Sequence, residues 1–471
     1  MEPVERVLSE LPQEIITRDQ DIVSAYATDF RRQYVGTTPA VLRPRNVEEV
    51  QRIVRACAAH RVGLVPQGGN TSYCTAATPS DRGDELVLSL ERMNRVREID
   101  PANLSLTADA GTILSELQQA AADADLMLPL ALGSQQSCRI GGNLSTNAGG
   151  INVVRYGMAR DLVLGLEVVL PNGSLYSELS PLRKNNSGYD VKQLFLGAEG
   201  TLGVITAVSL KLVRRPRQTV TAFLAIDEIA SLASILAQAQ IQTGEAVTSF
   251  EYVSNSSLQL LLQAKVNLRH PLQETSEHYV LLEVATASPV LNLEETVSAL
   301  LADLFETGLI TDGTIAASEQ QRADFWHLRE SIPEAEVHHG GSVKHDIAVR
   351  TSRLASFIER AAGIVKESAG GAILSVYGHV GDGNVHFNVV PPASADTAVF
   401  KRRFEAETSG KIYDLAFEMD GTFSAEYGIG RVKLDLLVAY GAKGKLELMR
   451  SMKDALDPVG IMNPGKVVPK P

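Results

Sequence analysis

Two histidines flank a short turn in the segment GHVGDGNVHFNVV, residues 378–390, and their type and spacing suggest metal chemistry. The turn at 381–384 separates two apolar, β-prone arms, which predicts a β-hairpin. In the simplest register His379 faces His386, and directly opposed residues hold their Cβ atoms about 4.5–5.5 Å apart. Two imidazoles so placed can share one metal ion. The alternative is that both are polar hairpin residues without a ligand, and this segment alone does not decide between the two.

The length and composition indicate a globular protein of two or more domains. The chain has 471 residues, of which 44% are hydrophobic and 21% charged. A net charge of −12 without a long basic run argues against nucleic acid and anionic membranes as partners. No stretch of 18 apolar residues and no apolar leader is present, so neither a membrane span nor a secretory signal is expected. Cys57, Cys74 and Cys138 form no CxxC pair, and we expect a reduced, cytoplasmic protein.

The elements that must position the histidines fall into separate parts of the chain. From about 46 to 215, helical and strand-like pieces alternate; the segment 46–62 predicts an amphipathic helix with Asn46 as its N-cap. The segment RRPRQ, 214–218, changes composition, and we place a domain boundary there. Strands and helices then alternate again, which predicts an α+β domain with helices on one face of an antiparallel or mixed sheet. The chain beyond about 396 is expected to be largely helical.

Three glycine-rich loops occupy the first part of the chain, at 66–72, 133–150 and 196–206. Successive glycines let backbone N–H groups approach an anion closely, because no Cβ intervenes. None of the three matches GxGxxG or GxxxxGK[ST], so neither a Rossmann fingerprint nor a P-loop is present. Singly each loop is better explained as a tight turn, whereas all three together favour a pyrophosphate cradle.

These loops, together with NPGKV at 463–467, resemble those of the vanillyl-alcohol-oxidase/PCMH-type flavoproteins, and within them the FAD-linked D-2-hydroxy-acid dehydrogenases. The resemblance covers nearly the whole chain. It implies an α+β protein with a PCMH-type FAD-binding domain of two α+β subdomains at 1–215. A ferredoxin-like α+β substrate (cap) domain, which includes the metal-binding hairpin, would follow at 216–425. A helical C-terminal segment, 426–471, would return to the FAD site.

The resemblance also implies which residues contact FAD. Relatives that attach FAD covalently carry a histidine where this chain has Asn70, so we expect the flavin to be bound non-covalently. The implied flavin-contacting residues are Pro66, Gln67, Gly68, Gly69, Asn70, Thr71 and Ser72 in the first loop, Gly133, Ser134, Gly141, Gly142, Asn143, Ser145, Thr146 and Gly150 in the second, Glu199, Gly200 and Ile205 in the third, and Asn463 in NPGKV.

The same resemblance gives the two histidines a third partner. In the D-2-hydroxyglutarate dehydrogenase branch, the pattern HxGDGNxH is similar to residues 379–386, and a later glutamate completes the metal site. That glutamate corresponds to Glu426, in SAEYGIG. The resemblance therefore implies a divalent metal, zinc by preference, at His379, His386 and Glu426. Three protein ligands leave a position open for substrate, which is typical of a catalytic site.

One departure from the family pattern concerns the base that removes the hydroxyl proton. The family has a histidine directly after the glutamate, whereas this chain has Tyr427. A tyrosine, with an ordinary pKa of about 10, is a poor base unless its environment lowers that value. Tyr427 could act as a perturbed base, orient the substrate, or pack against the flavin, and the sequence leaves all three open.

Substrate carboxylates call for cations, and the resemblance points to Arg329 and Lys344 for a diacid. Asn384 could reach the substrate or serve only the turn. Pro333 stands where the family often has a hydroxyl residue, which weakens the assignment to one particular diacid. Weaker candidates at the edge of the flavin and substrate site are Arg31, Arg32 and Tyr34.

The expected function is FAD- and metal-dependent oxidation of a D-2-hydroxy acid, with D-2-hydroxyglutarate converted to 2-oxoglutarate. Hydride would pass to flavin N5, and the electrons to a separate acceptor such as an electron-transfer flavoprotein. D-Lactate or glycolate is the alternative substrate. A homodimer is a candidate assembly, and the sequence does not specify the oligomeric state. Two other classes compete with this reading: a zinc hydrolase using His379, His386 and Glu426, and a glycine-rich subunit without chemistry of its own.

Overall fold

The computed structural model describes residues 2–264 and 268–469, and the chain divides into two compact units. The first unit comprises the chain up to Gly149, Gly157–Arg215 and the chain from Glu426. The second comprises Gly150–Tyr156 and Pro216–Ala425. The short segment Gly150–Tyr156, which the sequence analysis leaves in the first domain, thus belongs to the second unit.

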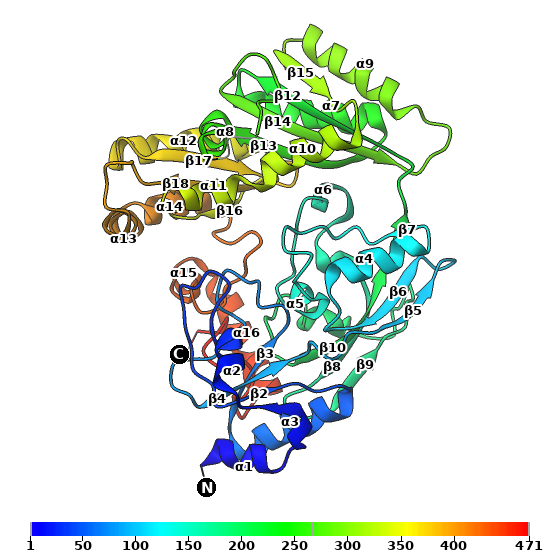
Figure 1. The fold of residues 1–471 in the computed structure, drawn as a ribbon, viewed down its shortest axis with the longest axis vertical. Coiled ribbons are helices and arrows are strands. Elements are labelled where there is room, and N and C mark those ends of the chain that lie inside the picture. Colours follow the sequence, from blue (N-terminus) through cyan, green and yellow to red (C-terminus); the bar gives the residue numbers. More distant parts are fainter. Residues whose placement is uncertain (1, 265–267, 470–471) are drawn as a thin grey trace. The chain divides into compact units, whose positions relative to one another are not determined.

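The first unit contains two principal sheets, each covered by helices (Figure 1). Asn46 caps α3 as expected, because its side chain accepts a hydrogen bond from the backbone N–H of Glu49. One sheet has the order β1-β2-β4-β3, in which β2, β4 and β3 are parallel. Its strands are β1 (Ile16–Thr17), β2 (Val41–Leu42), β3 (Gly63–Gln67) and β4 (Glu85–Ser89).

The second sheet of this unit is antiparallel, with the order β5-β6-β10-β8-β9. Its strands are β5 (Val96–Asp100), β6 (Ser105–Asp109), β8 (Val163–Val169), β9 (Leu175–Glu178) and β10 (Val204–Lys211), and a small pair is formed by β7 (Leu126–Met127) and β11 (Val213–Arg214). The helices of the unit are α1 (Pro3–Ser9), α2 (Gln20–Ala27), α3 (Val47–His60), α4 (Leu114–Asp123), α5 (Ile140–Ser145), α15 (Leu434–Tyr440) and α16 (Lys443–Leu456). Two α+β layers are the arrangement that the resemblance implies for the FAD-binding domain.

The second unit is built on one antiparallel sheet with the order β15-β12-β14-β13-β17-β18-β16 (Figure 1). Its first four strands in chain order are arranged 4-1-3-2, which is the ferredoxin-like arrangement expected for this part of the chain. The hairpin with the two histidines extends that sheet. The strands are β12 (Gln218–Ile226), β13 (Val247–Ser254), β14 (His278–Thr286), β15 (Asp312–Ile315), β16 (Asp346–Ala348), β17 (Ile373–Gly378) and β18 (Asn384–Val390).

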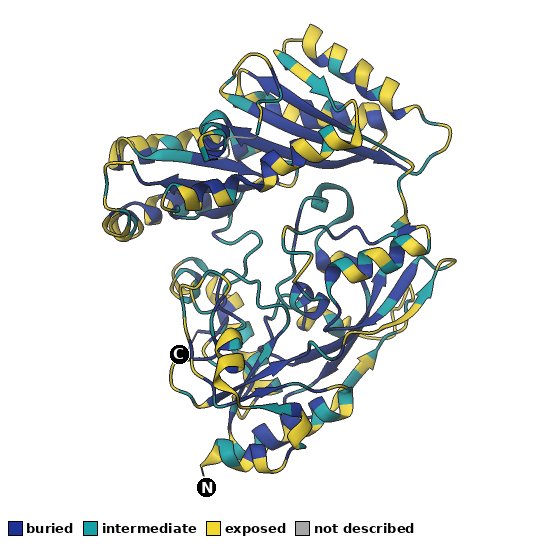
Figure 2. Ribbon diagram, in the orientation of Figure 1, coloured by how far each residue is buried: buried dark blue, intermediate teal, exposed yellow. Residues whose placement is uncertain are grey.

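Helices cover both faces of this sheet, whereas the sequence analysis places them on one face. The central strands are buried along almost their whole length (Figure 2), so side chains pointing either way require a cover. One face packs against α7 (Leu232–Thr243), α9 (Leu293–Glu306), α12 (Leu354–Ser368), α13 (Thr397–Glu407) and α14 (Ser409–Glu418). The other packs against α8 (Asn255–Ala264), α10 (Glu319–Glu330) and α11 (Ile332–His338).

The remaining helix of the second unit, α6 (Val153–Tyr156), explains why its segment belongs there. The hydroxyl of Ser249 in β13 donates to the carbonyl of Ile151, and the Arg155 guanidinium donates to the carbonyl of Ala246 at 3.2 Å.

In the part of the chain that the structure describes, no helix is both long enough and apolar enough to cross a membrane.

Candidate functional site

The hairpin is present, but its register differs from the simplest one. Tyr377 pairs with His386, so His379 lies opposite Asn384, whose backbone N–H donates to the His379 carbonyl at 3.2 Å. The prediction that His379 faces His386 directly is therefore wrong. The turn is longer than expected because Gly378, at φ +146°, ends β17 before the histidine.

The two imidazoles nevertheless lie side by side. His379 and His386 are diagonal neighbours on the same face of the hairpin, within reach of one another for long side chains. Their ring centroids are 5.6 Å apart and both residues are buried. Glu426 directly follows Ala425, the last residue of the second unit, whose backbone N–H donates to the Asp346 carbonyl. One ligand atom from each of His379, His386 and Glu426 lies within 4.8 Å of the other two.

The donor set suits a divalent metal. Two buried imidazoles and a carboxylate are ligands that zinc accepts at about 2.0–2.2 Å, which separates tetrahedral ligands by about 3.4 Å. The present spacing is at most somewhat wider, so small side-chain movements would bring the three ligands to that distance. These residues therefore fit a metal ion that acts as a Lewis acid.

Glu251, in β13, is a residue that the sequence analysis missed. It is 0% exposed, and its Oε1 lies 2.6 Å from Nδ1 of His379 while its Oε2 accepts from Nε of Arg329 at 2.7 Å. Burial opposes its charge, but the His379 and Arg329 contacts outweigh burial and hold the pKa of the Glu251 carboxyl well below its usual range. The available signal was a glutamate between Phe250 and Tyr252, the one charged residue of this buried strand.

The two predicted substrate cations each face a buried carboxylate. Arg329 is buried rather than solvated, and its guanidinium lies over the Tyr377 ring at 4.9 Å from the centroid. Nζ of Lys344 is 2.6 Å from Oε2 of Glu336. Glu336 also accepts from Ser342 and, through Oε1, from Asn388. Both cations are therefore already held in place by the protein.

In the side-chain amide of Asn384, the nitrogen is hydrogen-bonded and the oxygen is not, among the described residues. Its Nδ2 donates to Oδ1 of Asp346 at 3.1 Å and to the carbonyl of Ile347 at 2.9 Å. Its Oδ1 is buried without a hydrogen-bond partner among the described residues. Because buried polar atoms are rarely left unpaired, this oxygen favours the substrate reading of Asn384 over the turn reading.

In the first unit, the first two glycine loops pack against each other so closely that no side chain fits between them. A Cβ on Gly68 would lie 3.3 Å from Cα of Gly142, and one on Gly69 would lie 2.2 Å from the carbonyl oxygen of Ser137. Asn70 is held at φ +53° and its side chain donates to the carbonyl of Thr28. The resulting cradle of bare backbone is the kind of surface that a pyrophosphate needs.

The other predicted flavin residues have different environments. Gln67 Nε2 donates to the carbonyls of Tyr26 and Ala77, which fixes the end of β3. The hydroxyls of Ser145 and Thr146 donate to carbonyls of their own helix. Gly200, at φ +73°, faces Pro66, and Ile205 lies in the core of the unit. Gly133 is exposed, Ser134 bonds to its own turn, and Gly150 belongs to the second unit.

Glu199 joins the third loop to two other segments of the first unit. Its Oε1 and Oε2 accept from the backbone N–H groups of Ile429 and Gly430 at 2.7 and 2.9 Å. Its own carbonyl accepts from Nδ2 of Asn463 at 2.6 Å. Burial raises the pKa of Glu199 to about 7, against these two backbone hydrogen bonds, which favour its charged form.

Two buried amide oxygens near these loops test whether a flavin fits. Oδ1 of Asn143 and Oδ1 of Asn463 have no hydrogen-bond partner among the described residues. Unpaired buried acceptors of this kind call for a donor, which an isoalloxazine ring or a ribityl chain can supply. The cradle and these acceptors therefore fit FAD.

Tyr427 belongs to an aromatic cluster of the first unit. Its ring meets that of Tyr73 edge-on, with centroids 4.7 Å apart, and Nζ of Lys433 lies 5.6 Å from its centroid. The weaker candidates lie in the same cluster or beside it: Arg31 lies over Tyr73, and Tyr34 lies under Arg431, while Arg32 is exposed at φ +54°. Tyr73 was not predicted, because only its contact with Tyr427 marks it.

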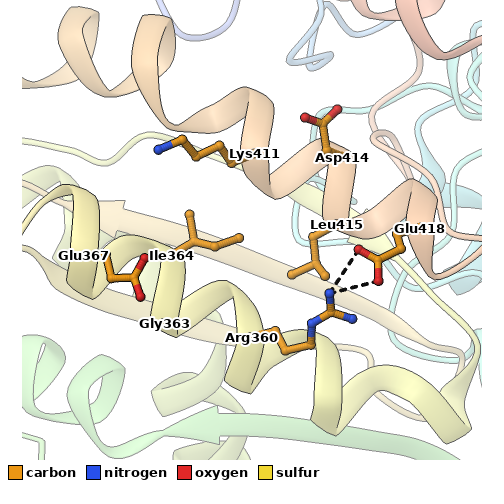
Figure 3. A pocket seen from close by; sticks show the side chains of 8 residues that line it. All are labelled: Arg360, Gly363, Ile364, Glu367, Lys411, Asp414, Leu415 and Glu418. Atoms are coloured by element: carbon orange, nitrogen blue, oxygen red, sulfur yellow. Dashed lines mark hydrogen bonds and ion pairs between the residues drawn. The ribbon is translucent and has the colours of Figure 1, made fainter.

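A groove of about 370 Å³ between α12 and α14 of the second unit contains none of the predicted residues (Figure 3). It is crossed by hydrogen bonds from Arg360 to Glu418 at 2.9 and 3.0 Å. Its lining combines charged residues with glycine and two aliphatic residues: Arg360, Gly363, Ile364, Glu367, Lys411, Asp414, Leu415 and Glu418.

Comparison with known families identifies the class of the protein. Residues 215–467 match the family described as FAD linked oxidases, C-terminal domain, and residues 38–177 match an FAD binding domain. The chain belongs to the family of FAD-linked oxidases and is an FAD-dependent oxidoreductase. This membership confirms the predicted family.

Relatives of known name extend over nearly the whole chain. The chain is 37% identical over 461 residues to the mitochondrial D-2-hydroxyglutarate dehydrogenase of Danio rerio, covering 98% of this chain and 84% of that protein. It is 34% identical to the D-2-hydroxyglutarate dehydrogenase of Stutzerimonas stutzeri, covering 97% and 96%. It is 35% identical to the D-2-hydroxyglutarate–pyruvate transhydrogenase of Saccharomyces cerevisiae, covering 95% and 90%.

Solved structures confirm the predicted fold class. The chain superposes on p-cresol methylhydroxylase with a TM-score of 0.75 at 15% identity, covering 98% of this chain and 96% of that one. Alkyldihydroxyacetonephosphate synthase gives a TM-score of 0.72 at 17% identity, covering 98% and 84%.

Proposed function

We propose that the protein oxidises D-2-hydroxyglutarate to 2-oxoglutarate, using non-covalent FAD and a divalent metal. The observation that carries the proposal is the group His379, His386 and Glu426, with the buried Arg329 linked to His379 through Glu251. The names of the dehydrogenase relatives support the same substrate. D-Lactate and glycolate remain the alternatives, because Arg329 and Lys344 each already have a carboxylate partner.

The chemistry divides between bound groups and side chains. FAD bound by the glycine loops would supply a hydride acceptor, its N5, and a route for the electrons to a separate acceptor such as an electron-transfer flavoprotein. The metal, when bound, is a Lewis acid for the hydroxyl and the adjacent carboxylate. His379, His386 and Glu426 would hold the metal, and Asn384 would offer its unpaired Oδ1 to the substrate hydroxyl.

The cations select the substrate by its charge. Arg329 is fixed by Glu251 and Tyr377, so it can meet a carboxylate without losing much side-chain entropy on binding. Lys344 is fixed by Glu336 in the same way and would provide a second positive charge for a diacid. Tyr427 is the candidate for accepting the hydroxyl proton, since it follows the metal ligand Glu426 directly.

Anaerobic reduction of the flavin tests the proposal. The purified protein should be yellow, and D-2-hydroxyglutarate should bleach it faster than D-lactate or glycolate does at equal concentration. L-2-Hydroxyglutarate serves as the matched control, because it has the same charge and composition and should leave the colour unchanged. Faster bleaching by D-lactate would move the assignment to a monoacid, and an unbleached yellow protein would contradict hydroxy-acid oxidation.

A further inference from the structure

Glu251 joins two parts of the candidate site that the sequence keeps far apart. One carboxylate oxygen contacts Nδ1 of His379 at 2.6 Å, and the other accepts from Nε of Arg329 at 2.7 Å. The three residues come from β13, the loop after β17 and the end of α10. Burying a carboxylate completely costs desolvation free energy, even when both of its oxygens have partners. The question is therefore what function this buried carboxylate has.

The contact with His379 determines which ring nitrogen is available. A neutral imidazole carries one N–H and one lone pair, and a carboxylate at Nδ1 holds the N–H there. The lone pair then belongs to Nε2, the nitrogen on the far side of the ring. Ligand histidines commonly have their second nitrogen fixed by a carboxylate in this way, which sets the tautomer and the ring orientation.

The contact with Arg329 fixes the orientation of the guanidinium plane. Because Nε lies inside the guanidinium group, a hydrogen bond at that atom orients the whole fork, and the Tyr377 ring at 4.9 Å supports it from one face. The same carboxylate therefore constrains the ligand histidine and the predicted substrate cation together.

We propose that Glu251 is a positioning residue that presents Nε2 of His379 to the metal and couples that presentation to the orientation of Arg329. The inference rests on the proposed metal function. It predicts that loss of the Glu251 carboxylate weakens metal binding in the protein without substrate. The alternative is that Glu251 only stabilises the sheet, as many buried ion pairs do.

The chain offers a matched control in Glu283. It lies on the neighbouring strand β14, opposite Ser249, and therefore on the same face of the sheet as Glu251. It is also buried and pairs with an arginine of α10, Arg322, while accepting from Trp326 at 2.7 Å and from Thr221 at 2.8 Å. It differs from Glu251 in that none of these contacts is made with a candidate metal ligand.

The decisive experiment compares zinc affinity in E251Q, E283Q and the parent protein, each with FAD bound and stripped of metal. Competition with a chromogenic chelator should give a dissociation constant about 10- to 100-fold weaker in E251Q. The glutamine of E251Q has a single acceptor oxygen for two donors, so it cannot satisfy His379 and Arg329 together. E283Q should change the affinity less than about threefold, whatever its effect on thermal stability.

A second measurement keeps the test independent of metal and of folding yield. Nitrogen chemical shifts of labelled histidine should report the Nδ1–H tautomer of His379 in the metal-free parent protein and a mixture in Glu251→Asp, whose shorter side chain reaches less well. Unchanged zinc affinity in E251Q, with a parent protein that binds zinc, overturns the inference alone. A parent protein that binds no zinc overturns the proposed metal function as well.

Discussion

Asn70 occupies a backbone conformation that suits its own side chain. Its φ of +53° lies in the left-handed region, which asparagine tolerates better than most residues. Its amide donates to the carbonyl of Thr28, so the side chain is directed at the protein backbone. An amide nitrogen of this kind offers no nucleophile for a bond to the flavin.

Non-covalent FAD is therefore expected at this position. Acid precipitation of the yellow protein should release the colour into the supernatant, and the released flavin should co-migrate with authentic FAD in chromatography. A yellow pellet after washing in acid and denaturant would contradict the assignment, because only a covalent bond survives that treatment.

A second prediction at the residue scale concerns Tyr427 as the acceptor of the hydroxyl proton. If it accepts the hydroxyl proton, Tyr427→Phe should reduce the rate of flavin reduction by a factor on the order of 10² or more, as expected for a lost general base. Tyr73→Phe is the matched control, since it keeps the edge-on ring pair at 4.7 Å and removes a different hydroxyl. A loss of less than about threefold in Tyr427→Phe would leave this residue an orienting or packing role.

Residue types near the site were predictable to different degrees. His379, His386 and Glu426 were found because they stand in motifs that are local in the sequence. Glu251 was missed because its contact with His379 depends on the pairing of β13 with β17, at Tyr252 and Gly378, far apart along the chain. No local pattern carries that pairing.

At the scale of elements, the hairpin shows how one residue changes a predicted register. The pattern of apolar arms indicated β17 and β18 correctly, but Gly378 ends β17 one residue before His379. The loop then continues through Val380, whose N–H bonds to Gly378, and Gly381, whose N–H bonds to the carbonyl of Phe250. Backbone bonds to another strand decide this register, and the turn sequence alone does not contain them.

Glu199 makes a testable link between the third glycine loop and the segment after Tyr427. Its pKa is raised by burial to about 7, so the folded protein binds this proton more tightly than the unfolded chain, whose carboxyl keeps the ordinary 4.5. The free energy of unfolding therefore falls as the pH rises from about 4.5 to about 7, and this contribution is constant above about 7.

Glu199→Gln should remove that slope. As the pH rises from about 4.5 to about 7, the free energy of unfolding of the variant should increase by up to about 3 kcal/mol relative to that of the parent protein, since one pKa unit corresponds to about 1.4 kcal/mol. The measurement is urea unfolding at several pH values, followed by flavin fluorescence, which reports on the unit that contains the loops. Parallel pH curves for the two proteins would mean that Glu199 stays charged throughout.

At the scale of the whole molecule, the candidate site residues are divided between the two units. The glycine cradle lies in the first unit, while His379, His386, Glu251 and Arg329 lie in the second. The ferredoxin-like order was predictable from the resemblance, but helices on both faces were not inferred, because a nearly continuous apolar strand does not reveal which helices cover it. Gly150–Tyr156 clusters with the second unit, although in the sequence it continues a flavin loop without a break in composition.

This division leads to the last prediction, on metal removal. Exhaustive chelation should abolish turnover while leaving the protein yellow, because two of the three candidate ligands lie in the unit that does not contain the flavin cradle. Zinc, manganese or cobalt should restore activity to differing degrees, since each accepts nitrogen and oxygen ligands with its own preferred geometry. Replacing His386 by alanine should mimic chelation and resist rescue, with FAD content as the control. Full activity in a chelated sample that elemental analysis finds free of metal would make His379 and His386 polar hairpin residues, and the contact of Glu251 with His379 would then serve stability alone.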